Sequence, residues 1–231
     1  MKTIGMLGGM SWESTAVYYR ILNQEVQKRL GGVHSASIIL HSFDFAEVET
    51  LQAAAKWDEA AELLSSVGRK LALSGADFLM IACNTMHLMA GQIEQVAQKP
   101  VLHIADPLGE AIQAAGMKKV GLLGSIHTME KGGILIDRLR AKFGIETLLP
   151  DADDRAAIHR VIIDELVRGK FLSCSRALYR EFIAKLVDRG AEGIIMGCTE
   201  IPMLLIAEDS PVPMFDTTAL HAMAAVEKAF S

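Results

Sequence analysis

The sequence predicts an α/β protein made of two similar lobes, each a doubly wound parallel sheet. Short apolar runs of strand length alternate with longer stretches of helical spacing along the 231 residues. The second half of the chain repeats motifs of the first half in the same order. Hydrophobic residues make up 51% and aromatic residues only 6%, which suits helices packed on a buried sheet better than an all-β sandwich.

The expected elements alternate between strand and helix. Apolar runs predict strands at residues 3–7, 35–41, 77–82, 101–105, 119–123, 145–149, 193–196 and 213–215. Helical periodicity predicts helices at residues 13–29, 57–74, 86–98, 108–115, 129–143, 158–167, 175–189 and 219–230. The run DFLMIA at 77–82 is continuously apolar, as expected of a parallel strand covered on both faces. This alternation predicts a parallel architecture.

Two long matches relate the halves of the chain. MKTIGMLG at residues 1–8 matches MKKVGLLG at 117–124, and GADFLMIAC at 75–83 matches GAEGIIMGC at 190–198. Buried parallel strands resemble one another, so chance explains one such match. Two matches that keep their order, each offset by about half the chain, indicate a duplication that produced two lobes of about 100 residues. A weaker third match relates Asp106 and its preceding residues to Asp216.

Composition excludes several classes of protein. The net charge of −5 argues against a nucleic-acid binder, which normally carries a basic stripe. The sequence contains no run of about 18 apolar residues, so we expect no membrane span. The first residues, MKTIGMLGGMS, are too glycine-rich for a signal peptide, so we expect a cytoplasmic protein. Three cysteines, an odd number, fit a reducing compartment without a disulfide framework.

The duplication places a cysteine at the same point of each half. Cys83 and Cys198 each follow an expected strand and precede an expected helix start. Ligands bind beyond the carboxyl ends of strands in open α/β sheets, and a helix N-terminus favours the thiolate. If the lobes face each other, the two thiols approach one bound molecule from opposite faces. One then removes a proton as general base while the other donates one as general acid, which inverts a stereocentre.

The alternative for each cysteine is a small, buried apolar residue, as most free cysteines are. Repeat-equivalent positions with polar neighbours argue against that alternative for Cys83 and Cys198. Cys174 has no counterpart in the first half, so we expect it to be such a buried residue.

Three segments carry a family resemblance. GGMS at residues 8–11, CNTMH at 83–87 and GCTEI at 197–201 resemble the aspartate/glutamate racemase family, and the detail is most similar to its bacterial L-aspartate/glutamate-specific members. The likeness runs along the whole chain in order and includes WEST at 12–15 and LHIAD at 102–106.

The resemblance implies a cofactor-independent amino-acid racemase, an isomerase without metal or pyridoxal phosphate, whose acid/base residues are Cys83 and Cys198. In the family, the first-lobe thiol acts on the D-enantiomer and the second on the L-enantiomer, and some relatives carry Thr at the first position. The family fold implies a first lobe of residues 1–100 plus 211–231 and a second lobe of 101–210. These lobes are related by pseudo-twofold symmetry, with the active site between them. We also expect a homodimer.

Expected substrate-binding residues follow from position and from the resemblance. Asn84, Thr85 and Thr199 have amide, hydroxyl and backbone N–H groups that can hold the α-carboxylate. Met10 and Ser11 belong to the loop that begins at Gly8-Gly9, where glycine permits close approach of a ligand. Gln52 is carried over from close relatives. Helix capping alone is the alternative for the first three, and a plain tight turn is the alternative for the glycines.

The sequence departs from the family where a side-chain carboxylate is held. Aspartate racemases often place an Arg after the second strand, but residues 41–47 read HSFDFAE. Val167 stands where the family has a Lys, and Arg168 or Lys170 is the neighbouring basic residue expected to substitute for it. An acidic substrate is therefore a weaker expectation than the racemase chemistry.

Other chemistries lack their motifs. The Gly5–Gly9 segment matches neither a dinucleotide fingerprint nor a phosphate loop, and without HExxH or Cys-x2-Cys we expect no zinc site. We expect His87 to satisfy a backbone group rather than to line the site. Two alternatives to a racemase stay open. One is another enzyme of the superfamily, a decarboxylase or a cis–trans isomerase of small dicarboxylic acids, and the other is a non-catalytic amino-acid-binding module.

Overall fold

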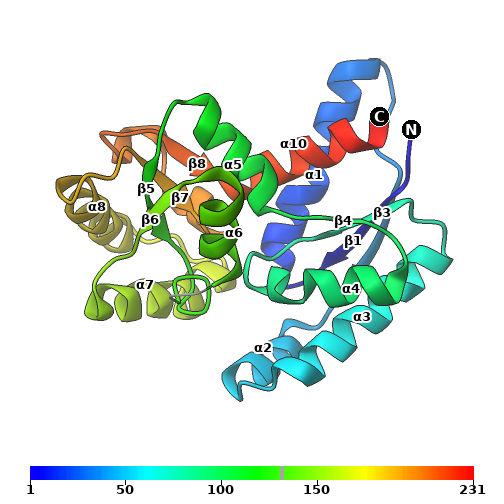
Figure 1. Cartoon of the computed structure of the whole chain (residues 1–231), viewed down its shortest axis with the longest axis horizontal. Coiled ribbons are helices and arrows are strands. Elements are labelled where there is room, and N and C mark those ends of the chain that lie inside the picture. The colour runs from blue at the N-terminus through cyan, green and yellow to red at the C-terminus, as the bar shows by residue number, and fades with distance from the viewer. Residues whose placement is uncertain (131–132) are drawn as a thin grey trace. The chain divides into compact units, whose positions relative to one another are not determined.

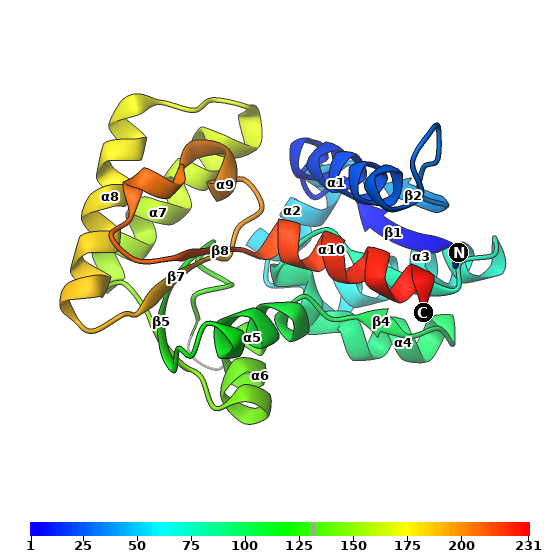
Figure 2. The same cartoon turned by 90° about the horizontal axis from the view of Figure 1, so that it is seen from above.

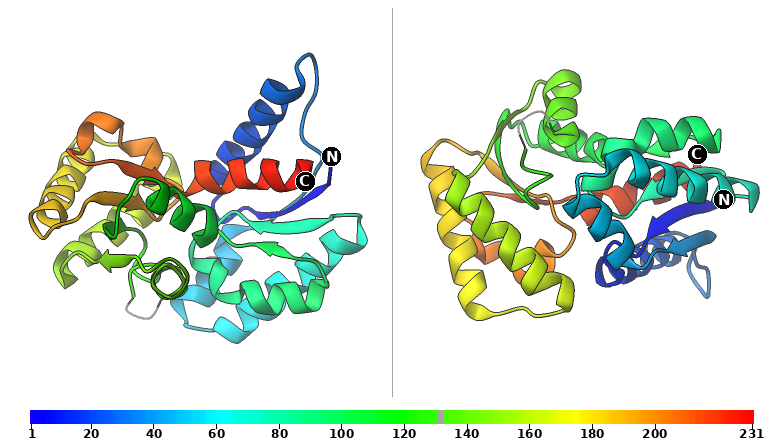
Figure 3. Two further views of the ribbon diagram at one scale, coloured as in Figure 1. Left: turned by 45° about the horizontal axis from the view of Figure 1, so that its top comes forward. Right: turned by 90° about the horizontal axis from the view of Figure 1, so that it is seen from below.

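The computed structural model of the chain describes residues 1–130 and 133–231, which form two compact units (Figure 1). Unit 1 comprises Met1–Ile104 and His221–Ser231, and unit 2 comprises Ala105–Leu220. The chain begins and ends in unit 1, where the Lys2 N–H donates to the Ala229 carbonyl at 2.7 Å (Figure 3).

Unit 1 is built on a four-stranded parallel sheet with the order β2-β1-β3-β4. Its strands are β1 (Ile4–Gly8), β2 (Ile38–Ser42), β3 (Phe78–Ile81) and β4 (Val101–Leu102). Its helices are α1 (Trp12–Leu30), α2 (Phe45–Ala53), α3 (Trp57–Leu73), the 3₁₀ helix η1 (Thr85–Met89), α4 (Ala90–Ala97) and the part of α10 (Thr217–Phe230) from His221 onward.

Both faces of this sheet are covered (Figure 1). Ile4 and Met6 point into an apolar cluster with α1 and α10, whereas Leu7 points into a second cluster with α3 and α4. The alternation follows from the two-residue period of a strand. It explains why the central strands β1 and β3 are buried along their whole length, because neither of their faces meets water.

Unit 2 is built on a second four-stranded parallel sheet, with the order β6-β5-β7-β8. Its strands are β5 (Lys119–Leu123), β6 (Glu146–Leu148), β7 (Gly193–Met196) and β8 (Met214–Asp216). Its helices are α5 (Ala105–Ala114), α6 (Ile134–Phe143), α7 (Ala152–Asp164), η2 (Leu166–Arg168), α8 (Ser173–Asp188), α9 (Ile201–Leu204), η3 (Ala207–Asp209) and the start of α10. Within this unit, α7 and α8 lie on one side of the sheet and α5 and α6 on the other (Figure 2).

The two sheets have the same connectivity. In each, the first strand lies between the second and the third, and the fourth strand pairs with the third. The strands that match in sequence, β1 with β5 and β3 with β7, hold the same places in their sheets. The predicted fold class, two similar parallel α/β sheets, is confirmed.

The structure differs from the expected elements in several places. Helix α2 was not expected, α5 and α7 begin earlier than predicted, and of the helix expected at 129–143 residues 131–132 lie outside the described part. The boundaries between the units follow Ile104 and Leu220, later in the chain than the expected boundaries after residues 100 and 210. β4 pairs with β3 and β8 pairs with β7, so each strand completes its own sheet before the chain enters the other unit. None of the described helices is long and apolar enough to cross a bilayer.

Candidate active site

Cys83 lies at the carboxyl end of the unit 1 sheet, directly after β3. The neighbouring strand β1 ends beside it, and the Ala82 N–H donates to the Leu7 carbonyl at 2.9 Å. The half-buried Cys83 packs against the apolar cluster that contains Met10 and Met86. The strand order therefore brings the Cys83 loop and the Gly8–Ser11 loop to one edge of the sheet.

The residues after Cys83 are buried polar groups. Asn84 and Thr85 are only 5% and 8% exposed, and they open the 3₁₀ helix η1. The Asn84 side chain does not cap this helix, so capping alone does not account for it. Nδ1 of His87 lies 2.8 Å from the Cys83 carbonyl oxygen. The expectation that His87 satisfies a backbone group is confirmed.

The loop after β1 is a tight turn that packs on the chain after β2. Gly9 has a φ of +87°, and a Cβ there would lie 2.3 Å from the Phe43 carbonyl oxygen. The Thr15 hydroxyl accepts from the Gly9 N–H and donates to the Ser11 carbonyl, both at 2.8 Å. The turn alternative thus explains Gly9. Its successors Met10 and Ser11 are 4% and 2% exposed.

Gln52 lies near the end of α2, the helix that follows β2. It is half-buried. Helix α2 begins after Asp44, whose side chain caps it by accepting from the Ala46 N–H at 3.1 Å. This position belongs to unit 1, as do Met10, Ser11, Asn84 and Thr85.

Cys198 occupies the equivalent place in unit 2, directly after β7. Its Sγ donates to Oε2 of Glu200 at 3.0 Å, and the Thr199 hydroxyl donates to the same oxygen at 2.9 Å. Thr199 and Glu200 are 4% and 2% exposed. Because the Thr199 hydroxyl binds a carboxylate, capping alone does not account for this residue.

Glu200 is a functional candidate that the sequence reasoning missed. The residue is visible in the GCTE motif, two positions after the cysteine, but its type alone does not reveal that the carboxylate turns back to the thiol. At the equivalent position unit 1 has Thr85, so the two thiols have different neighbours.

The surroundings of Cys198 are electrically negative. Burial raises the pKa of Tyr179 well above its usual value of 10. Cys198, when its thiol is ionised, and the carboxylates of Glu165 and Glu200 raise it further. The Tyr179 hydroxyl donates to the Ile158 carbonyl at 3.3 Å. This tyrosine is therefore neutral, and it is fully buried.

A second polar loop reaches the same edge of the unit 2 sheet. It follows β5, and the Gly197 N–H donates to the Leu123 carbonyl at 2.7 Å, so the two loops are adjacent. The hydroxyls of Ser125 and Thr128 lie 3.0 Å apart in it. The sequence reasoning missed this pair, although the match of Gly8 with Gly124 indicates a loop equivalent to Gly8–Ser11.

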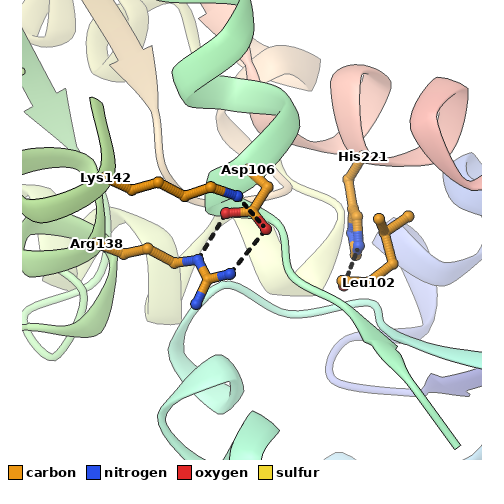
Figure 4. Close-up of polar contacts among 5 residues, drawn as sticks. All are labelled: Leu102, Asp106, Arg138, Lys142 and His221. Atoms are coloured by element: carbon orange, nitrogen blue, oxygen red, sulfur yellow. Dashed lines mark hydrogen bonds and ion pairs between the residues drawn. The ribbon is translucent and has the colours of Figure 1, made fainter.

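Asp106, from the weak third sequence match, holds a structural ion pair in unit 2. It accepts from Arg138 Nε and Nη2 at 2.6 and 2.8 Å, and Lys142 lies 3.1 Å away (Figure 4). Burial raises its pKa, but hydrogen bonds and charges of the two basic groups outweigh this and leave the pKa lowered. Its counterpart Asp216 forms no ion pair with a basic side chain among the described residues, and burial raises its pKa.

The remaining candidates take simple positions. Val167 is half-buried in η2, while Arg168 and Lys170 are exposed. The expectation for Cys174 is wrong, because this thiol is exposed in the first turn of α8. Within residues 1–130 and 133–231, no group of three or more His, Cys, Asp or Glu side chains is placed to hold a metal ion.

Fold and site define a class of protein: a duplicated α/β chain with a thiol at the carboxyl end of the third strand of each sheet. The family model of the Asp/Glu/Hydantoin racemases matches residues 7–225, and the chain belongs to this family of racemases. The predicted family is confirmed.

Similar proteins support the assignment. A structure of a candidate Asp/Glu racemase from Yersinia pestis is 49% identical, with a TM-score of 0.92 over 100% of both chains. An aspartate racemase homologue from Pyrococcus horikoshii is 28% identical, with a TM-score of 0.84 and the same coverage. The broad specificity amino-acid racemase RacX of Bacillus subtilis is 25% identical over 73% of this chain and 72% of its own.

Proposed function

We propose that this protein is a cofactor-independent racemase that interconverts the L and D enantiomers of an acidic amino acid, aspartate or glutamate. The observation that carries the proposal is the repeated thiol. Cys83 and Cys198 follow β3 and β7, which hold equivalent places in two sheets of the same strand order. The names of the Yersinia and Pyrococcus relatives support an acidic substrate.

In the proposed reaction, one cysteine acts as a thiolate and the other as a thiol. The thiolate takes the α-hydrogen as a proton, and the C–H electron pair remains on carbon, delocalised into the carboxylate. The other thiol then delivers its proton to the opposite face of that carbon. The protonation states of the two sulfurs are exchanged after each turnover, so a second turnover in the same direction requires proton exchange with solvent.

Glu200 gives the two thiols different roles at rest. A carboxylate next to a sulfur disfavours a second negative charge there, so Cys198 rests as a thiol that donates to Glu200. Cys83 has no carboxylate at the equivalent position, where Thr85 stands. We therefore assign Cys83 as the resting thiolate and Cys198 as the resting acid, with Glu200 able to receive the thiol proton when the reaction runs the other way.

The α-carboxylate is held by the loops that carry the cysteines. Asn84 and Thr85 contribute from unit 1 at the start of η1. The Thr199 hydroxyl proton is engaged by Glu200, so this residue contributes its backbone N–H. We also assign Met10, Ser11 and Gln52 to the walls of the substrate site.

A broad amino-acid specificity is the second candidate. Residues 41–47 contain no Arg, and the basic side chains nearest in sequence to the family's lysine position, Arg168 and Lys170, are exposed. A relative named for broad specificity supports this candidate. A decarboxylase needs only one thiol, and a binding module needs none, so the repeated thiol favours a racemase over both.

Circular dichroism of L-amino acids incubated with the protein tests the proposal. We expect L-aspartate or L-glutamate to lose optical activity, with the rate unchanged by EDTA or hydroxylamine. Racemisation of neutral and basic amino acids at similar rates would favour the broad-specificity candidate. A melting shift with an amino acid, but with optical activity preserved, would identify a binding module.

The proposal also includes a homodimer in the cytoplasm. All three cysteines are free thiols, which suits a reducing compartment. Light scattering at working concentration measures the oligomeric state. A mass near the 25.1 kDa of one chain would contradict the dimer.

A further inference from the structure

Unit 1 contains a cluster of three buried histidines. His87, His103 and His221 are 1%, 6% and 0% exposed. The ring of His87 lies 4.8 Å from that of His103 and 5.4 Å from that of His221, centroid to centroid. Tyr18 of α1 packs edge-on against His221, with centroids 5.7 Å apart. We call these four residues the imidazole cluster.

His221 is fixed through both ring nitrogens. Nε2 lies 2.9 Å from the Leu102 carbonyl oxygen (Figure 4), and Nδ1 lies 3.1 Å from the Tyr18 hydroxyl. A carbonyl only accepts, so Nε2 carries the proton and Nδ1 accepts from Tyr18. Burial, together with the neighbouring His87, lowers the pKa of His221 to about 3. The ring is therefore neutral and has one defined tautomer.

His87 connects the cluster to the proposed catalytic loop. Nδ1 lies 2.8 Å from the Cys83 carbonyl oxygen, so Nδ1 carries the proton and donates. The direction of this carbonyl fixes the orientation of the peptide plane that joins Cys83 to Asn84. A group that holds the carbonyl therefore helps to fix where the thiol and the Asn84 amide point.

Unit 2 holds the equivalent carbonyl differently. The Cys198 carbonyl accepts from the backbone N–H of Ile201 at 3.1 Å. Unit 1 uses a side chain for the corresponding task, and that side chain packs against two further imidazoles. The three imidazoles do not make a metal site, because no such group is found among the described residues.

We propose that the imidazole cluster positions the Cys83 loop. His87 holds the Cys83 carbonyl, while His103, His221 and Tyr18 keep the His87 ring in place. His87 is thus a positioning residue, which acts on the reaction through Cys83. The catalytic consequence depends on the proposed function, but the effect on the Cys83 loop does not.

Alkylation of the three cysteines tests the proposal within one molecule. The full-length protein is treated with iodoacetamide, and labelling of the Cys83, Cys198 and Cys174 peptides is followed by mass spectrometry. Loss of the bond in His87→Leu loosens the loop, so Cys83 is expected to react about three- to tenfold faster. Cys198 and the exposed Cys174 keep their rates within about twofold, because a single bond of unit 1 has been removed. In His87→Asn the side-chain amide donates in place of Nδ1, and the Cys83 rate returns toward that of the parent.

Three results would overturn the proposal. The first is a parent-like Cys83 rate in His87→Leu, and the second is an equal rise at all three cysteines, which would indicate general loosening. The third is identical behaviour of the Leu and Asn variants. If His87→Leu does not fold, Tyr18→Phe removes only the hydroxyl that holds His221. It is expected to raise the rate at which Cys83 is alkylated by about twofold. An unchanged rate would show that Tyr18 and His221 do not help to position the Cys83 loop.

Kinetics separate positioning from binding. We expect His87→Leu to lower kcat more than it raises KM, and His87→Asn to restore kcat. If Cys83→Ser racemises as fast as the parent, the proposed function fails. The labelling result still stands in that case, so the two failures are distinguishable.

Discussion

The thiol of Cys198 donates to the carboxylate of Glu200, with Sγ 3.0 Å from Oε2. The duplication placed two thiols at equivalent sheet positions. The residue two positions after the thiol, however, is Glu200 in unit 2 and Thr85 in unit 1. Racemisation needs one thiolate and one thiol at a time, and two identical surroundings would not favour either arrangement. In the proposed mechanism, this difference between the units gives the two thiols a defined resting state.

Glu200→Gln is expected to lower kcat by at least about tenfold, less than the ~10²–10⁴-fold expected for loss of a thiol. A Gln side chain still accepts a hydrogen bond but takes up no proton and carries no charge. Initial rates for both enantiomers, measured by circular dichroism, check this. Glu208→Gln, an exposed carboxylate of the same unit, is the control. Equal rates in the two variants would contradict a role for Glu200.

The buried His221 makes stability depend on pH. Its pKa of about 3 in the folded protein is below the value of 6.5 that it has when exposed, so the unfolded chain binds the extra proton. The contribution to stability is complete above pH 6.5 and is lost as the pH falls toward 3. Below pH 6.5 the free energy of unfolding is expected to fall by up to about 1.4 kcal/mol per pH unit from this residue.

Urea unfolding between pH 5 and 6.5 measures this slope before most carboxylates titrate. His221→Gln keeps a donor for the Leu102 carbonyl but does not titrate, so its slope is expected to be smaller by about one proton. Parallel slopes for the parent and His221→Gln would contradict the neutral state of His221.

Gly9→Ala is expected to lower the free energy of unfolding by at least about 2 kcal/mol. The φ of +87° is strained for Ala, and the new methyl group would collide with Phe43 backbone that cannot move aside easily. Gly91→Ala is the matched control, because a Cβ there meets open space at the start of α4. It is expected to leave stability unchanged or raise it by up to about 1 kcal/mol. Denaturant unfolding measures the free energy of unfolding of both variants. Equal effects would contradict the requirement for glycine in the turn at Gly9.

Asp106→Asn is expected to destabilise the protein by about 1–2 kcal/mol, because Arg138 and Lys142 lose their shared carboxylate. The side chains of Arg138 and Lys142 are partly exposed, which limits the loss of stability. Since the pKa of Asp106 is lowered on folding, its contribution is present above pH 3.8 and fades as the pH falls further. Thermal unfolding at pH 7 measures the effect against Asp164→Asn, an exposed carboxylate. No difference between these variants would show that the ion pair is dispensable.

The strands and the thiol positions were predictable from the sequence, whereas helix α2 and the imidazole cluster were not. Strand β7 is a continuous apolar run, because both of its faces are covered. Helix α2 buries Val48 fully and little else, so it has no apolar periodicity to detect. His87, His103 and His221 come from distant points of the chain, and only the pairing of β3 with β4 and the return of α10 bring them together.

The predicted site residues divide into two groups for the same reason. Met10, Ser11, Asn84 and Thr85 follow adjacent strands, so parallel-sheet geometry alone predicts that they share one sheet edge. The hydrogen bond from Cys198 to Glu200 depends on the local backbone of the GCTE turn, where Glu200 has helical torsions. A motif reveals that such a residue is present but not where its side chain points.

Proton NMR in heavy water with each single-thiol variant tests the two-thiol mechanism most directly. Cys83→Ser is expected to exchange the α-hydrogen of the L-substrate for deuterium with little inversion, because Cys198 remains. Cys198→Ser is expected to do the same for the D-substrate, and both variants are expected to keep substrate binding. Racemisation by Cys198→Ser at the parent rate would contradict the mechanism and leave the duplicated cysteines as structural residues.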